Sequence, residues 1–170
     1  MKVIIYTDGA CRGNPGPGGY GTILSTRRKD GSEYRKELSA GYRLTTNNRM
    51  ELLAAIMGLE ALQMPCEVEL YSDSKYLVDA FLQGWVKKWQ RFGWYKDAKR
   101  KDKVKNDDLW KRLLAAMEPH EVELHWVKGH ADNPDNNRCD ELAVNAAEDS
   151  VHWLEDEAYL PEAGESGALR

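Results

Sequence analysis

The sequence of 170 residues has few cysteines and no long apolar run. Its three cysteines, Cys11, Cys66 and Cys139, lie far apart and form no CxxC pair. An odd number of isolated cysteines argues against a disulfide framework or a zinc site and suits a reducing compartment. No stretch is long enough to cross a bilayer, and the first residues lack the apolar region of a signal peptide. We therefore expect a cytoplasmic protein with small buried thiols and no membrane partner.

The length and composition fit one globular domain. Hydrophobic residues make up 42% of the chain and charged residues 31%, as in ordinary soluble proteins. Residues 150–170 differ, because they are acidic, contain Pro161, Gly164 and Gly167, and show little periodicity. We expect a domain over residues 1–149 and a C-terminal tail that is mostly flexible or loosely docked. An ordered tail packed on the basic segment is the alternative.

The net charge of −4 hides a segregation of charge along the chain. Residues 85–106 hold nine basic side chains against two acidic ones, so this segment carries +7 and the rest carries −11. Binding of a charged partner depends on this local distribution of charge rather than on the net charge. A nucleic-acid partner is therefore compatible with the acidic total.

The order of predicted elements indicates a mixed α/β fold. Alternating, β-branched segments predict strands at 2–7, 20–28 and 33–43, joined by a Gly-rich loop or hairpin at 9–19 and an Asp30-Gly31 turn. Further strands are predicted at 67–72 and 121–127. Helices are predicted at about 45–63, 74–82, 85–92, 107–117 and 138–148. The order βββαβαααβα predicts a mixed five-stranded sheet with helices on both faces.

Four acidic residues occupy positions where a ligand site could form. Asp8 and Asp73 each follow a hydrophobic strand, Glu51 lies early in the first helix, and Asp140 lies early in the last. Each has an ordinary structural explanation as a turn, surface or helix-start residue. If the four converge, their repulsion requires cations, and oxygen-only ligands select Mg²⁺, with Mn²⁺ as a substitute. Two such ions suit phosphodiester hydrolysis.

Five ordered motifs resemble type 1 ribonuclease H, the bacterial ribonuclease HI family. The motifs are DGACRGNPGPGGYG at 8–21, TTNNRMEL at 45–52, YSDS at 71–74, WVKGHA at 126–131 and RCDELA at 138–143. The similarity covers about residues 1–149. It implies a ribonuclease H-like fold and a monomeric endonuclease that hydrolyses the RNA strand of RNA–DNA hybrids with two metal ions. The products would carry 5′-phosphate and 3′-hydroxyl ends.

The resemblance assigns roles to particular residues. Asp8, Glu51, Asp73 and Asp140 match the metal-binding carboxylates, and His130 matches a loop histidine that assists proton transfer or product release. A histidine that titrates near neutrality suits that task. The residues that correspond to hybrid contacts are Cys11, Asn14, Thr46, Asn47, Asn48, Trp85, Lys87, Lys88 and Asn106. Asn47 could instead only cap the helix.

Residues 85–106 resemble the family's basic protrusion, with WVKKWQRFGW at 85–94. Lysines there would neutralise phosphates, Trp85 would pack on a deoxyribose, and Trp89 and Trp94 would pack within the protein. A solvated face or a membrane-surface helix is the alternative. Lys75 and Leu44 depart from the family pattern and receive no role.

Three other functions use parts of the same pattern. A hybrid-binding module without catalysis would lack a ligand carboxylate, but all four are present. A transposase or integrase relative would lack the full motif set and the protrusion. A stand-alone exonuclease has no separate support.

Overall fold

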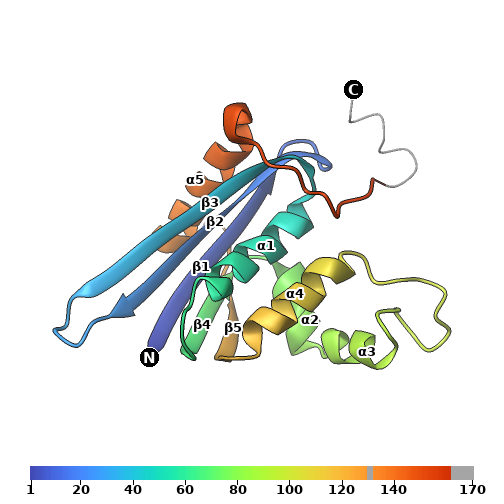
Figure 1. Cartoon of the computed structure of the whole chain (residues 1–170), viewed down its shortest axis with the longest axis horizontal. Coiled ribbons are helices and arrows are strands. Elements are labelled where there is room, and N and C mark those ends of the chain that lie inside the picture. Colours follow the sequence, from blue (N-terminus) through green and yellow to red (C-terminus); the bar gives the residue numbers. More distant parts are fainter. Residues whose placement is uncertain (130–131, 162–170) are drawn as a thin grey trace.

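The computed structural model describes residues 1–129 and 132–161. One five-stranded sheet has the strand order β3-β2-β1-β4-β5 (Figure 1). Its strands are β1 (Lys2–Cys11), β2 (Gly16–Arg27), β3 (Glu33–Thr45), β4 (Glu67–Ser72) and β5 (Glu121–Trp126). The first three strands are antiparallel, and β4 and β5 run parallel to β1. The sheet is therefore mixed, as the sequence predicted.

Helices cover both faces of this sheet. They are α1 (Asn47–Glu60), α2 (Lys75–Leu82), α3 (Trp85–Arg91), α4 (Asp107–Met117) and α5 (Pro134–Glu148). Helix α5 packs on β1, β2 and β3 from one side, whereas α1 packs on the other side and carries α4 against it (Figure 1). The predicted α/β fold and its element order are confirmed, with a short 3₁₀ turn, η1 (Ser150–His152), added after α5.

The main core lies between the sheet and the layer formed by α1 and α4. Alternate residues of β1 and β4 point into it, which is why Val3, Ile5, Val68 and Leu70 are buried while the residues between them are less so. Helix α1 is buried along most of its length, at residues 49–56, 58 and 59. The other helix of this layer is α4, whose Trp110 is completely buried.

Several predicted boundaries differ from the structure, among them the end of β1, the start of β2 and the start of the last helix. Strand β1 continues beyond Thr7 to Cys11, because residues 8–11 pair with β2 after the pairing with β4 has stopped at Ser72. The last helix starts at Pro134 rather than near Arg138. Asn133 caps it by accepting hydrogen bonds from the backbone N–H groups of residues 135 and 136, and proline suits a first helical position.

The segment after α5 lies along β3 and the start of α1 as far as Pro161. Leu154 forms an isolated bridge with Tyr42, and Arg43 pairs with Glu155. Asp156 accepts hydrogen bonds from the Arg49 guanidinium at 2.7 and 3.0 Å and from the Thr45 hydroxyl at 2.7 Å. These contacts are made with β3 and α1. The described part of the tail is thus docked chiefly on these two elements, and its residues 158–160 line a hollow together with Lys103 and Lys105 of the basic segment.

Within residues 1–129 and 132–161, no helix is long and apolar enough to cross a membrane. All three cysteines are free, and Cys66 and Cys139 are buried as expected.

Candidate active site

Three of the predicted carboxylates meet at the carboxyl end of the parallel strands. Oxygen atoms of Asp8, Glu51 and Asp73 lie within 4.8 Å of one another. The Asp140 side chain on α5 is close enough to Asp8 to share a hydrogen bond with it. The four predicted acidic residues, which are far apart in the sequence, therefore form one cluster.

The topology explains why the cluster forms there. Strands β1 and β4 pair in parallel until Thr7 and Ser72, so the next residue of each, Asp8 and Asp73, leaves the paired region at the same edge. Helix α1 brings Glu51 to this edge, and α5 brings Asp140 across it. Ligand sites of α/β sheets collect at such strand ends.

Gly9 allows α1 to approach β1 closely. Its backbone N–H donates to Asp8 Oδ1 at 2.9 Å and to Glu51 Oε1 at 2.6 Å. A Cβ atom at this position would lie 2.6 Å from the backbone nitrogen of Glu51, which is shorter than real Cβ contacts. The glycine thus fixes two acidic side chains through one amide, which a larger residue could not do without moving the helix.

Burial and mutual repulsion favour the protonated forms of these acids in the absence of a cation. The pKa of Asp8 is raised to about 8, mainly by burial and also by repulsion from Asp73 and Asp140, against a hydrogen bond with Glu51 that lowers it. Burial raises the pKa of Glu51 well above its ordinary value, and the Asp8 charge acts in the same direction. Two buried acids that repel each other are stabilised by a cation between them.

The donor set fits a hard divalent metal. Glu51 Oε2 is buried and accepts no hydrogen bond from the described part of the chain. A buried carboxylate oxygen without a partner is costly, and a metal ion would satisfy it. The cluster offers only carboxylate oxygens, which are the ligands of Mg²⁺ and Mn²⁺.

Four of the residues matched to hybrid contacts line one hollow of about 430 Å³ beside the carboxylates. They are Asn14, Thr46, Asn48 and Asn106, and the neighbouring Lys103 and Lys105 line it as well. Amides, a hydroxyl and two ammonium groups in one concavity suit a phosphate and its sugar. The structure therefore brings together residues from three separate segments.

The side chains of this hollow are held in place by local hydrogen bonds. Thr46 caps α1 by accepting from the Arg49 N–H, which leaves the hydroxyl proton free to donate. Asn106 has a left-handed backbone (φ 62°), and its amide bonds Tyr76 and Arg49 instead of capping α4. Asn47 is inside α1 rather than its cap, and its N–H donates to Asn14 Oδ1 at 3.0 Å. The capping alternative for Asn47 is thus wrong.

Cys11 lies at the side of the site but is not activated. Its half-buried thiol is 3.5 Å from the carbonyl oxygen of Gly16 and 3.4 Å from that of Thr45. Burial raises the pKa of this thiol. Cys11 is therefore a neutral donor, and it is only half-buried where the sequence predicted a buried thiol.

The basic protrusion consists of α3 and the segment that follows it. Lys87 and Lys88 are exposed on α3, and Trp85 is 44% exposed at its start. Trp89 packs edge-on against Trp110, with ring centroids 5.4 Å apart. As predicted, Trp89 packs within the protein, while the two lysines and Trp85 are exposed. Figure 1 shows α3 and the segment after it extending beyond α2 and α4.

The predicted His130 lies outside the described residues. The adjoining Gly129 packs against Asp73, since a Cβ there would lie 2.9 Å from Asp73 Oδ2. Trp126 Nε1 donates to the Asp73 backbone oxygen at 3.1 Å, and Lys75 Nζ lies 4.9 Å from the centre of the Trp126 ring. Lys75, to which the sequence assigned no role, thus belongs to the packing around Asp73.

Arg49 is a residue that sequence reasoning missed. Its side chain is only 3% exposed and forms ion pairs with Asp108 of α4 and Asp156 of the tail, both at 2.7 Å. Arg49 Nη1 also donates to Asn106 Oδ1 at 3.2 Å. Arg49 thus connects the tail to Asn106, one of the residues that line the polar hollow. Arg49 lies within the TTNNRMEL motif at 45–52, but the sequence does not show that its side chain is buried.

Comparisons with known proteins agree with this geometry. The RNase H family model matches residues 1–148. A ribonuclease H from Rippkaea orientalis is 55% identical over 93% of this chain and 92% of its own length. One from Klebsiella pneumoniae is 54% identical over 95% and 98%.

Solved structures give the same result. The crystal structure of LC9-RNase H1, a type 1 RNase H with the type 2 active-site motif, has a TM-score of 0.78 and 31% identity, and the match covers 99% of this chain and 81% of that one. LC11-RNase H1 in complex with an RNA/DNA hybrid has a TM-score of 0.60 and 27% identity, over 88% and 99%. The length of these matches, together with the converging carboxylates, establishes that this chain belongs to the ribonuclease H family.

Proposed function

We propose that this protein is an endoribonuclease that hydrolyses the RNA strand of RNA–DNA hybrids and leaves 5′-phosphate and 3′-hydroxyl ends. The observation that carries the proposal is the meeting of Asp8, Glu51, Asp73 and Asp140 beside a polar hollow. Relatives that share more than half of their residues with this chain are named ribonuclease H. A neighbour of 27% identity has been solved with an RNA/DNA hybrid.

We assign the metal site to the four carboxylates, with Mg²⁺ as the expected ion, Mn²⁺ as its substitute and two ions per site when substrate is bound. Such ions supply an activated water and stabilise the charge on the leaving oxygen. The chain contributes the fixed positions of its ligands. Gly9 orients Asp8 and Glu51 through its amide, and Trp126 holds the backbone of Asp73.

The polar residues bind and orient the two strands. Thr46 and Asn106 are placed to hold a phosphate of the DNA strand, with Lys103 and Lys105 adding positive charge. Asn14 and Asn48 line this hollow, and the N–H of Asn47 donates to Asn14; their amides can contact groove edges and 2′-hydroxyls. These 2′-hydroxyls are the groups that distinguish RNA from DNA.

Two further parts complete the proposal. Trp85, Lys87 and Lys88 on the protrusion contact the hybrid farther along, where lysines neutralise phosphates and the indole packs on a sugar. His130 assists proton transfer or product release, a role that rests on the motif resemblance alone. We also propose that residues 1–149 are the catalytic domain of a monomeric cytoplasmic enzyme and that 150–170 are an accessory tail.

Cleavage of a labelled RNA–DNA hybrid tests the function directly. We expect internal cuts in the RNA strand with Mg²⁺, no cuts with EDTA, and loss of cleavage in Asp8→Asn. The matched control is Asp30→Asn, which changes an exposed turn carboxylate and should cleave like the unmodified protein. Binding without cleavage would identify a non-catalytic module, and equal cutting of duplex DNA or duplex RNA would refute the hybrid specificity.

A further inference from the structure

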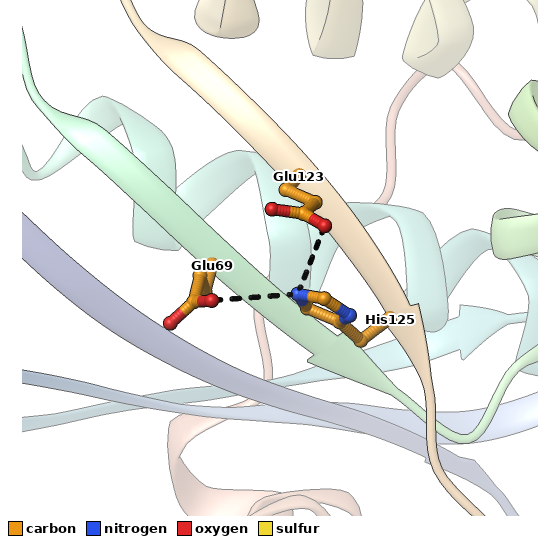
Figure 2. A group of neighbouring side chains, drawn as sticks. All are labelled: Glu69, Glu123 and His125. Carbon is orange, nitrogen blue, oxygen red and sulfur yellow. Dashed lines mark ion pairs between the residues drawn. The ribbon is translucent and has the colours of Figure 1, made fainter.

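A second group of possible metal ligands lies on the sheet face opposite α1, away from the catalytic carboxylates. Glu69 of β4 and Glu123 and His125 of β5 point toward one another from neighbouring strands (Figure 2). One ligand atom of each lies within 4.8 Å of the others. Helix α5 packs on β1, β2 and β3, so this part of the face remains partly open.

His125 Nε2 is the atom that points to a ligand. It lies 3.7 Å from Glu69 Oε1 and 3.9 Å from Glu123 Oε1. The dashed lines of Figure 2 mark these two contacts, which are ion pairs when the ring is protonated. The atom is buried, yet it makes no hydrogen bond within residues 1–129 and 132–161. Buried polar atoms are nearly always paired, because an unpaired one costs about 1–3 kcal/mol. A ligand bound between His125 Nε2 and the two carboxylate oxygens would remove that cost.

The strand register places like charges side by side on this face. Glu67 is opposite Glu121, and Glu69 is opposite Glu123. Carboxylates directly opposite each other on neighbouring strands destabilise a sheet. Lys2 is 3.6 Å from Glu69 but approaches its Oε2 atom, so the Oε1 atom that faces His125 is left for another cation.

The ring of His125 is held in position by stacking. Tyr6, Tyr71 and His125 stack in a row across three strands, with centroids 4.8 and 4.7 Å apart. A fixed imidazole loses little conformational freedom when it binds a ligand, which favours binding. Its backbone is also fixed, because β5 pairs with β4 over its whole length.

We propose that Glu69, Glu123 and His125 form a second divalent-cation site, suited to Zn²⁺ and similar borderline ions. Zinc sites that keep an open position take three protein ligands and one water, and imidazole nitrogens and carboxylate oxygens are among the ligands they use. In a tetrahedral site with metal–ligand bonds of about 2.1 Å, two ligands lie roughly 3.4 Å apart, so the observed 3.7 and 3.9 Å need to shorten by only a few tenths of an ångström. The Glu123 side chain is 73% exposed, so it can adjust and leaves the ion open to water on one side.

This site differs in chemistry from the catalytic cluster. The catalytic residues offer only oxygen ligands, whereas an imidazole favours Zn²⁺ over Mg²⁺. An ion here would tie edge strand β5 to β4. The residue after His125 is Trp126, which holds the backbone of Asp73, so the site connects to the active site through one strand end.

Calorimetric titration of the full chain with Zn²⁺ tests the proposal. The solution contains millimolar Mg²⁺ to occupy the oxygen-only cluster. We expect one Zn²⁺ site whose affinity falls by at least roughly 10- to 100-fold in His125→Gln and in Glu123→Gln. The matched control is His152→Gln, an exposed histidine beside Asp149, which should keep the full affinity. Equal Zn²⁺ affinity in all four proteins would overturn the site.

A second measurement does not depend on the variants. In the ¹⁵N NMR spectrum of histidine side chains, Nε2 of His125 should shift to the value of a metal-bound nitrogen on addition of one equivalent of Zn²⁺. Amide exchange in β5 should slow at the same time, because the ion joins the strand to β4. A His125 signal that stays unchanged while another histidine shifts would refute the proposal. Neither measurement uses nuclease activity, so their failure would leave the proposed function untouched.

Discussion

The clustered carboxylates Asp8, Glu51, Asp73 and Asp140 should make the metal-free protein less stable as the pH rises. A native pKa of about 8 for Asp8, against 3.8 for the ordinary group, means that the native state binds a proton over a range where the unfolded chain does not. Stability then decreases with increasing pH across this range and is lowest above about pH 8. Each unit of difference corresponds to about 1.4 kcal/mol, so the full effect is on the order of 5 kcal/mol. Such a loss is a large part of a typical domain's stability.

Replacing Asp8 by asparagine removes this effect. In EDTA, Asp8→Asn should have nearly the same free energy of unfolding as the unmodified protein at about pH 4, and should be more stable by several kcal/mol at about pH 8. Adding Mg²⁺ should raise the stability of the unmodified protein more than that of the variant, because a cation relieves the repulsion only where the charges exist. The variant would thus be a more stable protein without activity.

Urea unfolding followed by tryptophan fluorescence measures these differences at a series of pH values. The control is Asp30→Asn, because hydrogen bonds from Ser32 lower the pKa of Asp30. Asp30→Asn should therefore slightly lower the free energy of unfolding at neutral pH, whereas Asp8→Asn should raise it. If the difference between Asp8→Asn and the unmodified protein were the same at every pH, the reasoning from buried, repelling carboxylates would be refuted.

Three further predictions concern the tail, the glycine beside the site and the protrusion. Asp156→Ala should lower the free energy of unfolding by about 3 kcal/mol in urea titrations, because Arg49 is buried and keeps only one of its two carboxylate partners; an unchanged midpoint would contradict this. Gly9→Ala should abolish hybrid cleavage and reduce the melting temperature, because the added Cβ would collide with the α1 backbone; a fully active variant would show that the helix can move. Lys87→Ala combined with Lys88→Ala should weaken hybrid binding and reduce the slope of log affinity against log salt by up to about 2, with no change in thermal stability. A slope equal to that of the unmodified protein would exclude phosphate contacts there.

The sequence was sufficient for the fold because its periodicities are strong and its turns are clear. Strand β4 and helix α4 have the predicted bounds, since each is an unbroken pattern between turn residues. The Gly-rich segment was harder. Glycine is usually a signal for a loop, yet residues 16–19 are strand. At Gly19 this strand passes so close to α5 that a Cβ would lie 2.5 Å from the Ala143 oxygen, so only glycine fits there. That requirement comes from tertiary packing, which local pattern does not contain.

The sequence predicted which residues form the candidate site, but not which residues hold them in place. Ordered motifs identified the carboxylates and the asparagines, because those residues lie within short recognisable strings. The tail was different. Asp156 lies in a segment of low periodicity, and its importance depends on Arg49, a residue more than a hundred positions earlier. Neither segment alone indicates an ion pair with a distant part of the chain. For this reason the sequence predicted a mostly flexible tail.

The order of the strands has a consequence for synthesis on the ribosome. Strand β1 is made first but lies in the middle of the sheet, between β2 and β4, and its acid Asp8 reaches its last partner only on α5. Contacts between distant parts of a chain form slowly and late. A growing chain therefore carries an incomplete set of ligands until almost the whole domain has emerged. The enzyme cannot begin to cut hybrids before its own synthesis is nearly finished.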